Sequence, residues 1–240
     1  MNTKAYRRDC VFGALGALFM LAGDLCLSIV PASEGDSGLF AREAYLNGGF
    51  QSWRLPLLLA TGLIGMALGF FTVRAFYSQI DEKFKKTRMA LLIGGVVYVA
   101  SAGVLHFFIG SLADWTGKLA PILGREDTFA MIEEQYTRLM PAMYISYAGM
   151  FLFALTNFFA VVTKKTALPQ KMILFHMLVW QLVLVLIPDI RQLLGAELLG
   201  AGISTWDFVV SQSSGNASLF IWLIANAVRA GKQKNNTEVN

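Results

Sequence analysis

One acidic residue lies inside a long apolar run near the start of the chain, in the stretch Gly23-Asp24-Leu25. A histidine, His106, lies inside another apolar run. A charged side chain at bilayer depth costs about 2.5 to 3.5 kcal/mol on insertion scales, so it needs a partner or a wet cavity. A carboxylate and an imidazole can each bind a polar ligand or exchange protons. The elements that hold Asp24 and His106 therefore decide whether the two can act together.

Catalysis is one use of these residue types. Ser146 with Asp24 and His106 would supply a nucleophile, an acid and a base, but no elbow motif surrounds Ser146, and a serine in a helix commonly bonds its own backbone. A metal hydrolase needs three or more His, Asp or Glu ligands, whereas this chain has two histidines. Its two cysteines show no metal-binding spacing. We therefore expect no metal and no cofactor.

The composition is typical of a membrane protein. Hydrophobic residues make up 55% of the 240 residues and charged residues only 15%. Several apolar segments reach the roughly 20 residues needed to cross a ~30 Å hydrocarbon layer, and none alternates like a barrel strand. The sequence therefore predicts an all-α, polytopic bundle of six transmembrane helices. The predicted spans are residues 11–30, 55–77, 89–112, 141–163, 172–188 and 211–230.

Charged residues predict the orientation. Most of the 20 basic residues lie at or beside the N-terminus, between the second and third spans, between the fourth and fifth spans, and after the sixth. Most of the 16 acidic residues lie in the other three connections. The positive-inside rule then places both termini in the cytoplasm. We expect a multi-pass protein of the cytoplasmic membrane, with residues 1–232 as a single transmembrane domain and 233–240 as a cytoplasmic tail.

The first span has an alternative interpretation. Basic residues, an apolar run and the small residues before Ser33 also have the outline of a cleaved secretory signal. Asp24 inside the run, and the length of the run, favour a retained helix.

This topology predicts one polar pocket. At about 1.5 Å per residue, Asp24 and His106 lie at similar depths in the outer half of the membrane, near polar residues of the later spans. The predicted ligand-binding residues are Asp24, His106, Tyr144, Ser146, Tyr147, Gln181, Arg191 and Asn216. Polar residues in the inner half have structural explanations; Arg74, for example, can extend to the cytoplasmic surface.

Two further patterns concern packing. Phe129, Ile132, Tyr136 and Leu139 recur at helical spacing in residues 127–140, which predicts an amphipathic helix on the outer interface or capping the bundle. Residues 193–202 could form a similar short piece. Gly13 with Ala17, and Gly65 with Gly69, have the four-residue spacing that lets helices approach closely. These pairs predict contacts within the chain, with a homodimer through Gly65 and Gly69 as the alternative.

The stretches "GALGALFMLAGDL" and "SYAGMFLF", His106, and the region of Pro188 and Asn216 form a pattern over most of the chain. This pattern resembles a group of uncharacterised bacterial six-span membrane proteins with a Gly-Asp pair in the first span. The resemblance draws attention to Gly23, Asp24, His106, Ser146, Tyr147 and Asn216, and it implies no activity. The group often has a Pro-Arg-Trp-like turn after the fourth span, where this chain has "ALPQK".

The function expected from these observations is binding, or binding and transport, of a small polar or amphipathic ligand in an outward-facing pocket. A membrane enzyme acting on a lipid or lipid-linked substrate is one alternative. A structural role, in which Asp24 fixes the register of the helices, is another. The expected partners are membrane lipids and a small molecule. Nucleic acid is not expected, because the basic residues do not form one patch with interleaved aromatic residues.

Overall fold

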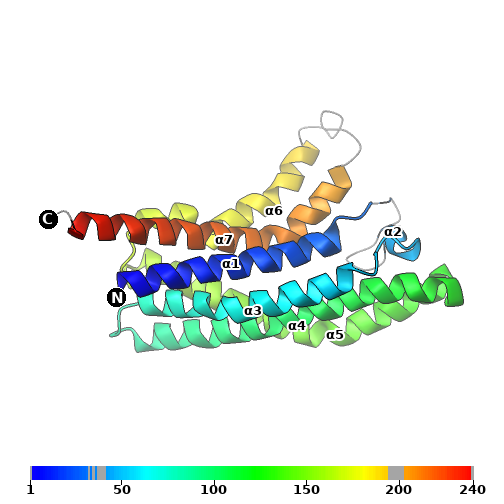
Figure 1. Cartoon of the computed structure of the whole chain (residues 1–240), viewed down its shortest axis with the longest axis horizontal. Helices are drawn as coiled ribbons and strands as arrows, with labels where there is room; N and C mark the ends of the chain where they lie inside the picture. Colours follow the sequence, from blue (N-terminus) through cyan, green and yellow to red (C-terminus); the bar gives the residue numbers. More distant parts are fainter. Residues whose placement is uncertain (1, 32, 34–35, 37–41, 194–202, 239–240) are drawn as a thin grey trace.

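The structure is a computed structural model of the chain, shown in Figure 1. It describes residues 2–31, 33, 36, 42–193 and 203–238, and their side chains except at 187–193, 203–208, 211–212 and 233–238. The described residues form an all-helical protein, as predicted. Its helices are α1 (Thr3–Ser28), α2 (Glu43–Leu46), α3 (Arg54–Gln79), α4 (Lys85–Leu123), α5 (Arg125–Val162), η1 (Gln170–Phe175, a 3-10 helix), α6 (Met177–Leu193) and α7 (Ile203–Glu238).

The long helices run alternately up and down the molecule (Figure 1). Helix α1 packs between α3 and α7, α4 packs between α3 and α5, and α6 packs mainly on α7. Both chain termini lie at one end, which we call the terminal end; the other is the loop end (Figure 1). Towards the loop end, α6 and the first part of α7 lean away from the other helices (Figure 1).

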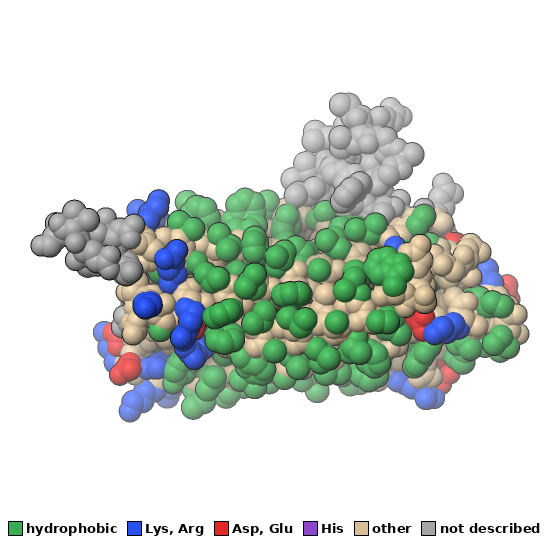
Figure 2. All heavy atoms as spheres, in the orientation of Figure 1, with side chains coloured by type: hydrophobic (Ala, Val, Ile, Leu, Met, Phe, Trp, Pro, Cys, Tyr) green, Lys and Arg blue, Asp and Glu red, His purple; other side chains and the backbone are tan. Residues whose placement is uncertain are grey.

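Four of the helices, α1, α3, α4 and α5, are long and apolar enough to cross a membrane. Large apolar side chains cover the middle of the face in Figure 2, and charged side chains gather at the two ends. The exposed large apolar side chains of the structure include Leu63, Ile93 and Phe159, with exposed fractions of 50%, 51% and 57%. Such a broad apolar surface suits contact with lipid rather than with water. The structure thus has the features of a membrane protein.

The later helices differ from their predicted limits. The predicted segment 172–188 contains a break, because η1 ends at Phe175, His176 is extended (ψ 140°) and α6 begins at Met177. The side chain of His176 stabilises the start of α6, since its Nδ1 accepts a hydrogen bond from the backbone N–H of Leu178 at 3.1 Å. Of the short piece predicted at 193–202, Leu193 ends α6 and residues 194–202 lie outside the described residues.

The amphipathic helix predicted for residues 127–140 is not a separate element. These residues form the first part of α5, which continues through Pro141 to Val162. Ile132 packs on Leu112 of α4, with Tyr136 and Leu139 beside them. Their apolar face therefore packs on the neighbouring helix α4. Of the two predicted arrangements, packing against the bundle agrees with the structure, whereas a separate helix lying on the interface does not.

The paired glycines of α3 contact other helices of the same chain. A Cβ atom on Gly65 would lie 2.5 Å from Met20 Cγ of α1, and one on Gly69 would lie 3.0 Å from Val99 Cγ1 of α4. The first distance is too short for a Cβ contact and the second is tighter than most such contacts, so the absence of a side chain lets α1 and α4 pack closely on α3. This is the packing within the chain that the four-residue spacing predicted; the homodimer stays a prediction.

Candidate ligand-binding cavity

Asp24 joins three helices. Its Oδ1 lies 3.2 Å from Nε2 of His106 in α4, and its Oδ2 accepts a hydrogen bond from Nδ2 of Asn216 in α7 at 2.8 Å. The carboxylate is nearly buried, with 9% of the residue exposed. Both oxygens therefore have a partner, as a buried acid requires.

Gly23 makes room for the histidine. A Cβ atom at this position would lie 3.0 Å from Nδ1 of His106 and 3.0 Å from Oγ1 of Thr61 in α3. These contacts are closer than most side chains allow. The two residues of the Gly-Asp pair thus have complementary roles: Gly23 leaves space for the imidazole of His106, and Asp24 contacts it.

A cavity of about 310 Å³ lies beside this cluster. Its polar wall includes Asp24, His106, Ser146, Gln181 and Asn216, and Tyr98 and Tyr147 also line it. The remaining wall is apolar and rich in methionine and leucine, for example Met20, Met143, Met150, Leu27, Leu58 and Leu105. The cavity can therefore accept a molecule with both a polar and an apolar part.

Most of the predicted ligand-binding residues line this one cavity. They are Asp24, His106, Ser146, Tyr147, Gln181 and Asn216. Tyr144 does not line it; its side chain faces outward and is 61% exposed. Arg191 belongs to α6, and its side chain lies outside the described part of the chain.

Several lining residues were not predicted, although helical spacing could have identified them. Met20, Gly23, Asp24 and Leu27 follow the i, i+3, i+4, i+7 pattern of one helix face, and all of them line the cavity. The same spacing relates Met143, Ser146, Tyr147 and Met150 in α5. In α4, Tyr98, Ala102, Leu105, His106 and Ile109 form a similar stripe. Adding the residues at positions i±3, i±4 and i±7 from each predicted polar residue would have identified most of the residues that line the cavity.

The geometry does not form a nucleophilic triad. Ser146 Oγ accepts a hydrogen bond from Ser101 Oγ at 2.7 Å, and no hydrogen bond joins Ser146 to His106 among the described residues. Within the same part of the chain, no three His, Cys, Asp or Glu side chains come close enough to hold a metal ion.

Stacked aromatic rings separate the cavity from the terminal end. Tyr98 stacks on Phe153 with ring centroids 6.4 Å apart, Phe153 stacks on Phe76 at 5.3 Å, and Phe76 contacts the edge of Trp222 at 6.4 Å. Phe76, Phe153 and Trp222 are each at most 1% exposed. A packed aromatic layer of these four residues thus lies next to the cavity on that side, since Tyr98 also lines the cavity.

Beyond the aromatic layer, buried polar residues bond to one another. His176 Nε2 lies 3.0 Å from Asn157 Oδ1, which also accepts from the Trp222 indole N–H at 3.2 Å. Because His176 Nδ1 accepts from Leu178, the hydrogen of the neutral ring is on Nε2. Arg74, which was predicted to extend to the surface, also forms an ion pair: its Nε donates a hydrogen bond to Oδ2 of the buried Asp9 at 2.7 Å.

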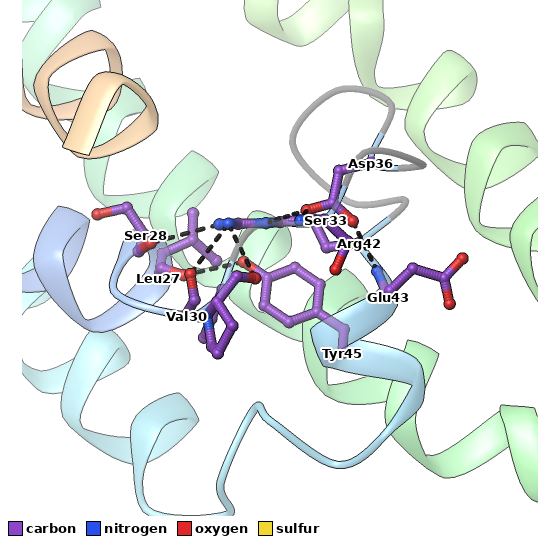
Figure 3. Close-up of polar contacts among 9 residues, drawn as sticks. Leu27, Ser28, Val30, Ser33, Asp36, Arg42, Glu43 and Tyr45 are labelled. Carbon is purple, nitrogen blue, oxygen red and sulfur yellow. Dashed lines mark hydrogen bonds and ion pairs between the residues drawn. The ribbon is translucent and has the colours of Figure 1, made fainter. Parts of the chain in front are cut away.

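At the loop end, Arg42 holds the connection between α1 and α2 against the end of α1 (Figure 3). Its buried guanidinium donates to the carbonyl oxygens of Ser28 and Val30 at 3.3 and 3.1 Å and lies 3.4 Å from Asp36 Oδ2. The Tyr45 hydroxyl donates to Leu27 O at 2.9 Å. These bonds satisfy carbonyl groups that have no partner within the helix. Burial raises the pKa of Tyr45 to about 12.

Arg54 supports the same helix end. Its Nη1 donates to the carbonyl oxygens of Cys26 at 2.7 Å and Ile29 at 2.9 Å. Leu27 lines the cavity, and the carbonyl groups of the residues before and after it, Cys26 and Ser28, are each held by an arginine. Neither arginine was predicted to have this role, because the sequence does not show which carbonyls a loop arginine reaches.

The fold and the cavity define an all-helical protein with membrane-spanning character and a polar, partly apolar site inside the bundle. Residues 1–226 match the model of a family described as a family of unknown function (DUF6796), and the chain belongs to that family. No curated protein and no solved structure matches it. The membership agrees with the resemblance to an uncharacterised group seen in the sequence.

Proposed function

We propose that the protein is a six-span protein of the cytoplasmic membrane that binds a small amphipathic ligand in its outward-facing cavity. The observation that carries this proposal is the contact of a nearly buried carboxylate, Asp24, with a cavity of about 310 Å³. A carboxylate that served only to fix the register of the helices would need its hydrogen-bond partners but no cavity beside it. This volume is at the lower limit of ordinary small-molecule sites.

The proposed topology uses α1, α3, α4, α5, α6 and α7 as spans. The basic residues at the terminal end support a cytoplasmic location for both termini. Asp24 in α1 and Asn216 in α7 lie nearer to the loop ends of their helices, and this topology then places the cavity in the outer half of the membrane. Reporter fusions after Lys234 test this topology: a cytoplasmic signal is expected, and an extracytoplasmic signal contradicts it.

The charge of the lining favours a neutral or positively charged polar group on the ligand. Asp24 is the only acid and His106 the only group that can be cationic among the described lining residues. No lysine or arginine among them would neutralise a phosphate or a carboxylate. Hydroxyl groups and amines can instead donate hydrogen bonds to Asp24, Ser146 or Gln181.

Access from the membrane explains why the ligand would be amphipathic. Tyr147 of α5 and Gln181 of α6 both line the cavity, although α5 and α6 make few contacts with each other. Tyr147 is also 44% exposed. We propose that the ligand enters between these two helices from the outer leaflet and leaves its apolar part against the methionine-rich wall. Because the aromatic layer lies between the cavity and the terminal end, we propose binding rather than transport for this conformation.

Native mass spectrometry of the protein in mild detergent tests the proposal. A bound small molecule should appear as a mass adduct on the unaltered protein and be reduced at least tenfold in Asp24→Asn. Tyr144→Phe is the matched control, since Tyr144 lies on the same helix as Tyr147 but outside the cavity; it should keep the adduct. Thermal unfolding of each variant separates loss of ligand from loss of fold. Absence of an adduct, or equal adducts in Asp24→Asn and Tyr144→Phe, would contradict ligand binding at this site.

A further inference from the structure

A second cavity lies at the terminal end, far along the helices from Asp24. It is formed by the turn between α3 and α4 and by the connection between α5 and η1, and its volume is about 490 Å³. The two segments pair through a β-bridge between Ile80 and Thr166. Asp81 N–H donates to Lys165 O at 2.9 Å, and Ala167 N–H donates to Gln79 O at 3.0 Å. These bonds hold the walls of the cavity, which we call the basic groove, in a fixed relation.

Three cationic side chains line the basic groove: Arg88, Lys164 and Lys165. The Arg88 guanidinium lies over the ring of Tyr77, 4.1 Å from its centroid, and Lys165 Nζ lies 5.5 Å from the centroid of Phe84. Aromatic faces stabilise cations and keep them in place. Two of the three charges are therefore positioned by rings of α3 and of the α3–α4 turn.

The acids of the groove do not balance these charges. Asp81 pairs with Lys83, which lies 3.2 Å away and also donates its backbone N–H at 3.1 Å. The bond from the Lys83 backbone lowers the pKa of Asp81. Glu82 lies 3.6 Å from Arg88, but its side chain is 92% exposed, whereas that of Arg88 is 18% exposed. A contact at this distance with a solvated carboxylate is weak. The buried Nε of Arg88 has no hydrogen-bond partner among the described residues, so the guanidinium can still bind a stronger anion.

The backbone at Lys164 supports a role for its charge. Its φ of 57° is in the left-handed region, and it is the one non-glycine residue with positive φ among the described residues. It ends α5 in a Schellman-type turn, with Lys164 N–H bonded to Val161 O and Lys165 N–H bonded to Ala160 O. Glycine usually occupies this position because a side chain is strained there. A lysine at such a site points to a use for the side chain.

We propose that the basic groove binds a phosphate group, carried either by an anionic phospholipid of the adjacent leaflet or by a soluble phosphate compound. A guanidinium with two lysines is the arrangement that recognises phosphate, since arginine can donate two parallel hydrogen bonds and lysine adds point charge. In the proposed topology the groove lies at the cytoplasmic surface, where anionic lipids are enriched. The site is independent of the cavity at Asp24.

The test compares two variants that remove one positive charge each. Arg88 lines the groove, whereas Lys86 is exposed and does not line it. Native mass spectrometry with added phosphatidylglycerol should show about fivefold weaker retention of the lipid in Arg88→Gln than in Lys86→Gln, equivalent to about 1 kcal/mol. Lys164→Asn provides a second variant, because asparagine tolerates the left-handed conformation and the change leaves the Tyr77 contact intact. It should weaken retention similarly.

Phosphatidylcholine and inorganic phosphate distinguish the sources of the ligand. A lipid site retains phosphatidylglycerol over phosphatidylcholine, and millimolar phosphate does not displace it. If the groove instead binds soluble phosphate compounds, inorganic phosphate should raise the thermal stability of the unaltered protein and of Lys86→Gln, but not that of Arg88→Gln. Equal effects of Arg88→Gln and Lys86→Gln in both assays would mean that only general surface charge acts, and would overturn the proposal.

Discussion

The imidazole of His106 occupies the space beside Gly23 where any other residue would carry its side chain, with Nδ1 3.0 Å from the position of that Cβ. The same ring meets the next residue, Asp24, through Nε2 at 3.2 Å. One residue of α1 therefore provides the room and the next provides the bond. This relation links the packing of α1 and α4 to the polar wall of the cavity.

Gly23→Ala should destabilise the protein by about 1 to 3 kcal/mol, the usual cost of overpacking. The added methyl group must displace His106 or Thr61. Gly215→Ala is the control, since a Cβ there meets nothing within 4 Å although Gly215 also lines the cavity. Alanine at that helical position should be neutral or stabilising by up to about 1 kcal/mol. Thermal unfolding of both variants measures the difference, and equal stabilities would contradict the packing described for Gly23.

Asn216→Val should cost about 1 to 3 kcal/mol, because it leaves Oδ2 of the nearly buried Asp24 without its donor. Ser218→Ala, also on α7, is a suitable control because Ser218 Oγ donates to Gly215 O of its own helix and, among the described residues, makes no bond to another helix. Reversible unfolding in mixed micelles would measure both changes. If the two variants are equally stable, the Asp24–Asn216 bond does not contribute as proposed.

Arg42→Met should loosen the end of α1, because it removes donors to Ser28 O and Val30 O and the ion pair with Asp36. Hydrogen bonds of charged groups contribute about 1.5 to 3 kcal/mol each, and we expect a total loss in that range since water can replace some of them. Amide hydrogen exchange at residues 27–30 should accelerate. Arg125→Gln, which breaks an exposed pair with Glu43, should leave that exchange unchanged.

Tyr45 makes stability depend on alkaline pH. Its pKa is raised to about 12 in the folded protein from an ordinary value of 10. The neutral phenol is therefore favoured by folding: its contribution is complete below about pH 10 and is lost as the pH rises through about 12. At 1.36 kcal/mol per pKa unit the contribution is about 3 kcal/mol.

Tyr45→Phe isolates this effect from the other tyrosines and lysines. The variant loses the hydrogen bond to Leu27 O and is less stable at neutral pH. Its stability should fall less steeply than that of the unaltered protein between about pH 10 and 12. Parallel slopes over that range would show that Tyr45 does not titrate with a raised pKa.

The sequence predicted the all-helical fold because long apolar runs allow few alternatives in a membrane. It placed Asp24 and His106 at one depth, and the structure brings them within 3.2 Å of each other. Depth does not show direction, however, because an apolar helix surface gives no sign of which face is buried. For that reason Tyr144 and Tyr147 were predicted together, although only Tyr147 lines the cavity.

The ends of the helices were harder to predict. An apolar run marks the part of a helix that lies in lipid, whereas hydrogen bonding continues the helix into polar sequence. Helix α4 thus extends to Leu123 rather than 112, and α5 starts at Arg125 rather than 141. The contacts of Arg42 and Arg54 with α1 depend on the path of a connection, which local sequence does not specify.

The lengths of α4 and α5 have a practical consequence. At about 1.5 Å per residue, the 39 residues of α4 extend about 58 Å, well beyond a ~30 Å hydrocarbon layer. The two helices continue side by side to a short connection at Gly124, where a Cβ would meet nothing within 4 Å. A small rigid domain inserted there in helical register, or an antibody fragment raised against this hairpin, would add a visible mass to an otherwise featureless particle for electron cryomicroscopy.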